Sequence, residues 1–289
     1  MPAIMAWEGR SSLGAGSSGA TLLAGAVRPL AVARPLAPVT RFALPAEAAN
    51  PAPDIVRYLQ EIAERARGFV RGALMAATAD GSAAKALAAI SRIGAELASA
   101  YEAQFARQRE ADAELRSRMA AVECRRGCAF CCHVNVTVTP LEAVRLAVAL
   151  AEGRVPRRLE AIFAAAELME GRDAEGRQAL RAACPLLVDG ACSVYEIRPL
   201  ACRALLSQSA ARCEERFQAT GSGRRSTDLP SLVTPRLIAA GFVSGEMAAL
   251  QDLGLAGHLV ELTQSLALLL REPGTLARWL GGEDVFARP

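Results

Sequence analysis

Apolar residues recur at helical spacing along two stretches between residues 53 and 121. In the first stretch, the recurring residues are Ile55, Leu59, Ile62, Ala66 and Phe69. In the second stretch, which follows a break at "ADGS" (79–82), they are Leu87, Ile90, Ile93, Leu97, Tyr101 and Phe105. Side chains three to four positions apart fall on one face of an α-helix. The pattern therefore predicts two antiparallel helices whose apolar faces pack into a core.

A different pattern follows residue 133. The stretch "VNVTVT" (134–139) alternates apolar and polar residues, which is typical of a short strand. A helix start comes next, because Thr139 can cap the helix, Pro140 fits its first position and Glu142 completes a capping box. We expect this helix to run to Gly153, since glycine favours the C-terminal end of a helix.

The stretch "CPLLVDGACSVY" (184–195) predicts a β-hairpin. Asp189 and Gly190 form the two-residue turn that such hairpins prefer, and an apolar run lies on each side of it. The hairpin would bring the cysteines at its two ends, at 184 and 192, close together. Directly afterwards, Pro199 is expected to open a helix that carries Cys202.

Composition divides the chain into four segments. Residues 1–50 are rich in Gly, Ser, Ala and Pro without a sustained period, which predicts a disordered low-complexity tail. Residues 51–122 form the expected helical hairpin, and residues 123–218 a cysteine-cluster module. Residues 219–289 begin with a linker-like stretch and then return to a helical pattern. The expected fold class is mainly α, with helices around an irregular cysteine-rich metal-binding module that contains a small β-hairpin.

Charge and hydropathy exclude two classes of partner. The net charge of +3 comes without the concentrated basic stripe of a nucleic-acid-binding protein. No apolar run reaches the roughly 18 to 20 residues that a membrane-spanning helix needs. A signal or transit peptide within residues 1–50 is weakly indicated, because Arg28 interrupts its apolar run. We therefore expect a cytoplasmic protein, and the oligomeric state stays open.

Cysteine is the most informative residue type in the chain. All eight cysteines lie between residues 124 and 213, and four of them fall within nine positions, in "CRRGCAFCC" (124–132). The candidate metal ligands are Cys124, Cys128, Cys131, Cys132, Cys184, Cys192, Cys202 and Cys213. This clustering indicates that the segment uses thiols for a local chemical purpose.

Three chemistries could use these thiols. A disulfide framework is typical of small secreted domains that cannot build a core, whereas this chain is long enough to build one. The C-x3-C-x2-C spacing occurs in radical S-adenosylmethionine enzymes, but the βα alternation of their barrel is missing here. Metal ligation remains the favoured reading, because closely spaced thiolates suit Zn(II), iron–sulfur clusters or Cu(I).

The adjacent pair Cys131 and Cys132 limits how the ligands can be shared. Neighbouring side chains in extended backbone point to opposite faces, so we expect the two thiols to serve different purposes. Eight thiols could supply two four-cysteine sites or one cluster with spare thiols, and the sequence leaves both open. His133 could be a further ligand or a surface residue. Arginines beside the cysteines could offset the negative charge of a thiolate centre; they are Arg125, Arg126, Arg198 and Arg203.

Two blocks of sequence carry a resemblance to a known family. "CRRGCAFCCHVNVTVTPLEAVRLA" and "CPLLVDGACSVYEIRPLACR" resemble the YkgJ-like cysteine-cluster proteins, also described as a zinc- or iron-chelating domain. The resemblance covers roughly residues 120–215. It implies a bound metal centre whose ligands fall on the seven cysteines from Cys124 to Cys202, with Cys213 less clearly matched. A flagellin lysine N-methylase shares this type of module, so the resemblance also implies a protein-methylating activity as an alternative.

These observations lead to one main functional hypothesis and two alternatives. The main hypothesis is a metal-binding protein that holds a thiolate-ligated centre with a structural, redox or partner-docking role. We favour an iron–sulfur cluster, [4Fe–4S], over Zn(II), because seven or eight grouped thiols exceed what one zinc ion needs. The first alternative is an enzyme that modifies a protein substrate, such as a lysine N-methylase using S-adenosylmethionine. The second is a thiol-based metal carrier or sensor, which would leave a low-pKa thiol exposed.

Overall fold

Helices make up most of the chain in the computed structural model, which describes residues 27–33, 37–42, 44–45, 48, 50–219 and 231–287. The α-helices of these residues are α1 (Pro53–Thr78), α2 (Ala83–Ala111), α3 (Ala113–Ala120), α4 (Pro140–Ala151), α5 (Leu159–Met169), α6 (Ala174–Ala179), α7 (Leu200–Arg203), α8 (Ala210–Ala219), α9 (Val233–Asp252), α10 (Leu262–Arg271) and α11 (Thr275–Leu280). Two short 3-10 helices are η3 (Phe130–His133) and η4 (Tyr195–Ile197). The mainly α fold is confirmed.

Two small antiparallel sheets accompany the helices. Strand β1 (Thr137–Val138) pairs with β4 (Val260–Glu261), so that Thr137 lies opposite Glu261. Strand β2 (Leu187–Val188) pairs with β3 (Ala191–Cys192) in the hairpin that the sequence predicts. The alternating stretch 134–139 therefore does form a strand, although only two of its residues are paired.

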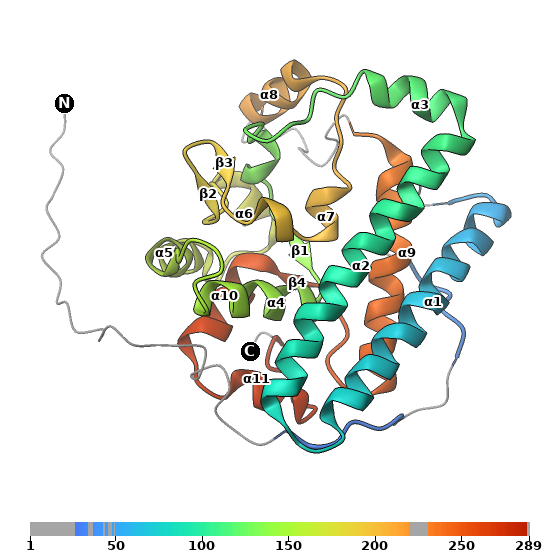
Figure 1. Cartoon of the computed structure of the whole chain (residues 1–289). Coiled ribbons are helices and arrows are strands. Elements are labelled where there is room, and N and C mark those ends of the chain that lie inside the picture. The colour runs from blue at the N-terminus through green and yellow to red at the C-terminus, as the bar shows by residue number, and fades with distance from the viewer. Residues whose placement is uncertain are drawn as a thin grey trace, which may run out of the picture.

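Three long helices form the frame of the molecule. Figure 1 shows α1, α2 and α9 running side by side, with α4 and α10 beside them and α5 to α8 and the hairpin β2–β3 gathered at one side of this frame. Helix α1 packs mainly against α9, and α2 contacts both α1 and α4. One hydrophobic core draws on both the N-terminal and the C-terminal helices, and Leu74, Ile90, Leu150 and Leu266 are fully enclosed in it.

The N-terminal helical region contains one helix more than the pattern predicts. Helix α2 ends at Ala111, and the charged residues after it form the separate helix α3. The break falls at Asp112, whose backbone is extended (φ −111°, ψ 109°) and whose carboxylate accepts a hydrogen bond from the Leu115 amide at 3.0 Å. An aspartate in this position caps a helix, so a new helix starts where continuous periodicity suggested an uninterrupted one.

Part of the segment expected to be a disordered tail is packed onto this frame. Val27 and Leu30 are buried in the core, and Val39 is also buried. The Leu30 amide donates to the Thr78 hydroxyl at 3.0 Å, and the Ala33 amide donates to the Asp252 carbonyl at 2.7 Å. These few apolar side chains and paired amides fix a segment that has no periodicity of its own. Residues 1–26 lie outside the described part of the chain.

A glycine-based contact lets α9 approach α1 closely. A Cβ atom at Gly245 would lie 2.2 Å from the Ala63 carbonyl oxygen, and one at Gly241 would lie 2.9 Å from the Ile62 side chain. Backbone cannot move aside as a flexible side chain can. Helix α9 is therefore restricted to glycine at position 245.

A buried ion pair fastens the same two helices. The Arg67 guanidinium of α1 donates two hydrogen bonds of 2.7 Å to the Asp252 carboxylate at the end of α9. A third hydrogen bond from Arg67 reaches the Ala37 carbonyl at 2.5 Å. The charge and hydrogen bonds raise the pKa of Arg67. Both partners are buried, and the removal of either one leaves the other with only a longer ion pair, Arg67 with Glu64 at 3.4 Å or Asp252 with Arg71 at 3.5 Å.

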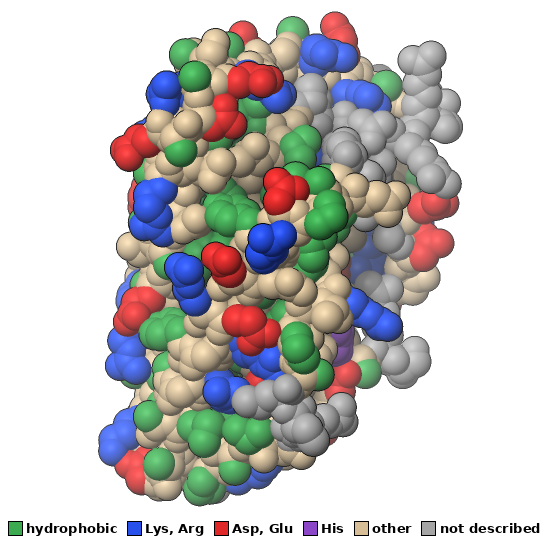
Figure 2. All heavy atoms as spheres, turned by 90° about the vertical axis from the view of Figure 1, so that its right-hand side faces the viewer, with side chains coloured by type: hydrophobic (Ala, Val, Ile, Leu, Met, Phe, Trp, Pro, Cys, Tyr) green, Lys and Arg blue, Asp and Glu red, His purple; other side chains and the backbone are tan. Residues whose placement is uncertain are grey.

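The outer face of the frame carries charges of both signs. Figure 2 shows Lys and Arg side chains interspersed with Asp and Glu side chains on the face to which the view is turned, together with scattered apolar groups. No helix within the described residues is long and apolar enough to cross a membrane.

The close approach of α9 to α1 leads to a prediction about stability. Gly245→Ala should lower the free energy of unfolding by about 3 kcal/mol, because overpacking against backbone is poorly relieved. Gly72→Ala in α1 is the matched control, since a Cβ there meets no atom within 4 Å. This control should raise stability by about 0.5–1 kcal/mol. Urea unfolding of both variants measures the difference. Equal unfolding midpoints would contradict the close contact between Gly245 and the Ala63 backbone.

A second prediction concerns the buried ion pair. Asp252→Asn should destabilise the protein by about 3 kcal/mol, because Arg67 would stay buried with only the longer contact to the half-exposed Glu64 as its counter-charge. The control is Glu96→Gln, which breaks the exposed pair between Arg92 and Glu96. That change should cost less than about 0.5 kcal/mol. A similar loss of stability in both variants would show that the buried ion pair of Arg67 contributes no more to stability than an exposed one.

Candidate metal centre

The first four cysteines lie on a turn followed by a single 3-10 helix. Gly127 has a positive φ of 95°, and the Cys128 amide donates to the Arg125 carbonyl at 3.0 Å, which closes a tight turn. Cys131 and Cys132 then lie within η3. Because η3 is helical, the two adjacent side chains leave the backbone at an angle smaller than that of an extended strand. Both Cys131 and Cys132 therefore face the same cavity.

The hairpin joins the cysteine turn through backbone hydrogen bonds. The Cys184 amide donates to the Cys132 carbonyl at 2.6 Å. Asp189 and Gly190 both have positive φ, 48° and 75°, as a two-residue hairpin turn of this kind requires. Cys192 lies opposite Leu187 in the ladder. The predicted turn therefore does bring the regions of Cys184 and Cys192 together.

Helix α7 brings Cys202 to the same place. It begins directly after Pro199, as the sequence predicts, and its first amide, that of Leu200, donates to Glu142 Oε1 at 2.7 Å. The other oxygen of Glu142 accepts the Thr139 amide at 3.1 Å, and the Thr139 hydroxyl accepts the Glu142 amide, so the predicted capping box of α4 is confirmed. One carboxylate thus fixes the starts of both α4 and α7.

These segments surround a cavity of about 250 Å³. Seven of the eight cysteines line it: Cys124, Cys128, Cys131, Cys132, Cys184, Cys192 and Cys202. Aliphatic side chains form much of the remaining wall, including Val136, Leu186 and Leu262. The arrangement gathers soft sulfur donors from three separate stretches of chain around one apolar space.

Cys213 lies apart from this set. It is buried on α8 and is absent from the cavity wall, although α8 packs against η3. Its side chain forms a hydrogen bond with Ser207, and the Ser207 amide donates to the Cys124 sulfur at 3.0 Å. Ser207 therefore connects Cys213 to Cys124 through two hydrogen bonds.

All eight cysteines are free thiols. Within the described residues, no three His, Cys, Asp or Glu side chains are already arranged to hold a metal ion. The cavity sulfurs surround a space instead of converging on one point. Their chemistry nevertheless fits a thiolate-bound metal, and metal binding of this kind usually completes the local fold.

Burial favours the protonated form of most of the cavity thiols. It raises the pKa of Cys184 to about 11, raises that of Cys202 well above its usual value, and also raises those of Cys124 and Cys192. The pKa of Cys131 is raised first by its hydrogen bond with the Cys132 side chain and then by burial. A cation in the cavity would supply the positive charge that buried thiolates need.

Arginines stand at the edge of this cavity. Arg125 and Arg198 line it, and the Arg198 guanidinium lies 3.8 Å from the centroid of the Tyr195 ring. Arg126 stacks over the same ring at 5.7 Å. The charge of Arg198 opposes the rise in the pKa values of Cys131 and Cys192. These cations favour negative charge on the nearby sulfurs, as the sequence suggested. The stacking of Arg126 and Arg198 on the Tyr195 ring was not predicted.

His133 faces away from the cavity. Its Nδ1 donates to the Ala129 carbonyl at 3.1 Å, and its ring lies 4.6 Å from that of Phe217 on α8. The Arg181 guanidinium also stacks on the Phe217 ring, 4.3 Å from its centroid. The histidine therefore packs η3 against α8. Nothing in the local sequence pattern marks Phe217 as the partner of His133.

The comparison with known proteins finds a match for the cysteine region alone. Residues 123–220, about a third of the chain, match the family model described as "CxxCxxCC: Putative zinc- or iron-chelating domain". No curated protein and no solved structure matches the chain. The matched residues begin just before Cys124 and extend past Cys213, so they contain all the cysteines of the cavity wall. Residues 123–220 are therefore similar to the zinc- or iron-chelating family that the cysteine blocks resemble.

Proposed function

We propose that the seven cavity cysteines bind a thiolate-ligated iron–sulfur cluster, with a single Zn(II) ion as the alternative, and that this centre holds the domain together. The observation that carries the proposal is the lining of one shared cavity by Cys124, Cys128, Cys131, Cys132, Cys184, Cys192 and Cys202. Such a centre would supply soft, thiolate-bound metal chemistry, and the protein's part is to position and desolvate the ligands.

The size of the cavity favours a polynuclear centre. A single zinc ion binds four sulfurs, each about 2.3 Å away, and leaves little free space between them. Here seven sulfurs are distributed around about 250 Å³. A cluster of several iron and sulfide ions uses more of this space and allows the ligands to lie farther apart.

The origin of the ligands supports a structural role. They come from the turn at 124–132, the hairpin at 184–192 and helix α7. Apart from short backbone contacts such as that from Cys184 to Cys132, these segments have little regular structure to hold them together. A metal bound by all three would cross-link them, which is how metals stabilise small irregular domains.

The pKa directions disfavour a thiol sensor. A reactive sensor cysteine needs a lowered pKa and access to solvent. Burial instead raises the pKa values of Cys124, Cys184, Cys192, Cys202 and Cys213. These thiols are suited to holding a cation and poorly suited to rapid oxidation.

The metal itself can be identified by anaerobic purification of the full chain, followed by metal and sulfide analysis and a visible spectrum. We expect iron, acid-labile sulfide and broad absorption in the visible range. Cys131→Ser should lose most of this absorption, because Cys131 lines the cavity. Cys213→Ser is the matched control and should retain it, since Cys213 lies outside the cavity wall. Colourless protein with stoichiometric zinc would replace the cluster with the alternative, and equal metal in all variants would refute the ligand assignment.

The structural role leads to a separate prediction about local stability. Removal of the metal with a chelator should increase amide hydrogen exchange in residues 124–203 by at least about a hundredfold, because a ligand present at a hundred times its Kd stabilises by about 2.7 kcal/mol. Amides in α1, α2 and α9 should change little, since their packing does not depend on the cysteines. A uniform change along the chain, or none in residues 124–203, would contradict the proposed cross-link.

A further inference from the structure

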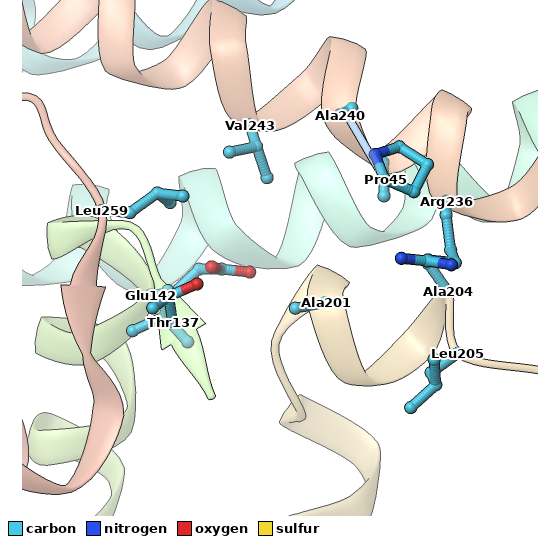
Figure 3. Close-up of a pocket in the computed structure, with 12 residues that line it drawn as sticks. Pro45, Thr137, Glu142, Ala201, Ala204, Leu205, Arg236, Ala240, Val243 and Leu259 are labelled. Carbon is cyan, nitrogen blue, oxygen red and sulfur yellow. The ribbon is translucent and has the colours of Figure 1, made fainter. Parts of the chain in front are cut away.

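The segment that joins α7 to α8, residues 204–209, belongs to no helix and no strand but is fixed along both of its edges. Figure 3 shows where it leaves α7, at Ala204 and Leu205, which line one cavity. One residue farther, the Leu206 carbonyl accepts the Leu232 amide at 2.8 Å. Because Leu232 directly precedes α9, this hydrogen bond ties one edge of the segment to the helical frame.

Ser207 pairs the other edge of the segment with the start of the cysteine turn. Its carbonyl accepts the Glu123 amide at 3.0 Å, and its amide donates to the Cys124 sulfur at 3.0 Å. The two stretches thus pair as neighbouring strands do, except that a sulfur replaces a carbonyl oxygen as one of the acceptors. Ser207 is 3% exposed, so its buried amide depends on this sulfur for a hydrogen bond.

The strength of this hydrogen bond depends on the charge of the sulfur. A neutral thiol is a weak acceptor, whereas the negatively charged sulfur of a metal-bound cysteine accepts a charge-assisted hydrogen bond, which is roughly twice as strong as a neutral one. The Ser207 amide therefore stabilises the metal-bound form of Cys124 more than the free thiol. Hydrogen bonds to ligand sulfurs are also one of the means by which proteins tune a thiolate-bound metal.

The direction of the Ser207 amide is set by contacts outside the cavity. The Ser207 hydroxyl accepts the Ser209 amide at 3.2 Å and forms a hydrogen bond with the Cys213 side chain of α8. The Glu123 carboxylate accepts the Ala210 amide, at the first residue of α8, at 2.5 Å. Helix α8 thus holds both partners of the paired stretch, so the amide points at the sulfur before any metal binds. This arrangement also gives Cys213 a supporting role outside the cavity wall.

We propose that Ser207 is a positioning residue of the metal centre, and that its amide holds the Cys124 sulfur in the orientation of a metal ligand. The proposal rests on the metal binding by the cavity cysteines that is proposed above. Groups that orient a ligand in this way typically contribute about tenfold to a hundredfold to metal affinity. Since the donor is a main-chain amide, only a substitution that removes the N–H deletes the contact itself.

The contribution of the amide can be measured with the full chain, reduced and metal-free, titrated with Co(II) in the absence of oxygen. Ser207→Pro removes the N–H, and Ser207→Ala is the matched control, because both lack the hydroxyl and only the alanine variant keeps the amide. We expect the Kd for Co(II) to be about 10–100-fold higher in Ser207→Pro than in Ser207→Ala. The sulfur-to-Co(II) charge-transfer band should also move to lower energy in Ser207→Pro, since a hydrogen bond no longer stabilises the sulfur electrons.

A double variant tests whether the effect acts through Cys124. In the Cys124→Ala background, Ser207→Pro and Ser207→Ala should have the same Kd for Co(II), because the acceptor sulfur is gone. Thermal melting of each metal-free variant verifies that it is folded. A remaining difference in Kd between the two double variants would show that proline acts on the backbone generally and would contradict the proposal.

A second measurement needs no substitution. In the isotope-labelled chain loaded with an NMR-active cadmium isotope, the Ser207 amide proton should show a scalar coupling to the metal, transmitted through the hydrogen bond and the Cys124 sulfur. The absence of any thiolate-to-metal band in the unaltered chain would refute the metal centre and this proposal with it. A normal band with equal Kd values in Ser207→Pro and Ser207→Ala, or cadmium binding without the coupling, would refute the role of Ser207 alone.

Discussion

The carboxylate of Glu142 is the single group on which the cysteine region depends most. Its two oxygens accept the amide of Thr139, at the start of α4, and the amide of Leu200, at the start of α7. Helix α4 is anchored in the core through Leu146 and Leu150, whereas α7 has only four residues and carries Cys202. A helix this short cannot hold its own position, because it has a single turn in which the amides of Cys202 and Arg203 both pair with the Pro199 carbonyl. Glu142 therefore transmits the rigidity of the helical frame to a segment that would otherwise have little of its own.

The same frame explains why an irregular module can be so cysteine-rich without disulfides. Buried thiols are tolerated as small apolar groups while they stay protonated, and burial raises the pKa values of Cys184 and Cys202. Ionisation of several of them in one apolar cavity would be too costly unless a cation were bound among them. Arg198, stacked on Tyr195, reduces this cost without occupying the cavity. The wall is thus tolerated while its thiols are neutral, and under the proposed metal binding it would become a ligand set as the metal replaced their protons.

Local signals in the sequence were sufficient wherever a structure is determined by neighbouring residues. The Thr139–Glu142 capping box and the Asp189–Gly190 turn were both predictable, because each depends on residues a few positions apart. The second role of Glu142 was not, since its partner Leu200 lies far along the chain and any amide can donate there. Strand β4 was also missed, because it has only two residues and exists through pairing with β1. The cysteine pattern indicated shared chemistry, but the exclusion of Cys213 from the cavity wall depends on the orientation of α8, which spacing does not reveal.

Helix α7 links the Glu142 carboxylate to the cysteine cavity, and this arrangement has a mechanical consequence. Its first residue, Leu200, donates to Glu142, and Cys202 lines the cavity two positions later. Any group that changes the charge or position of the Glu142 carboxylate acts on the amide that starts α7. Because α7 is only four residues long, a shift at its start reaches the sulfur of Cys202 within one helical turn. The position of the Cys202 sulfur in the cavity wall therefore depends on the Glu142 carboxylate through this one short helix.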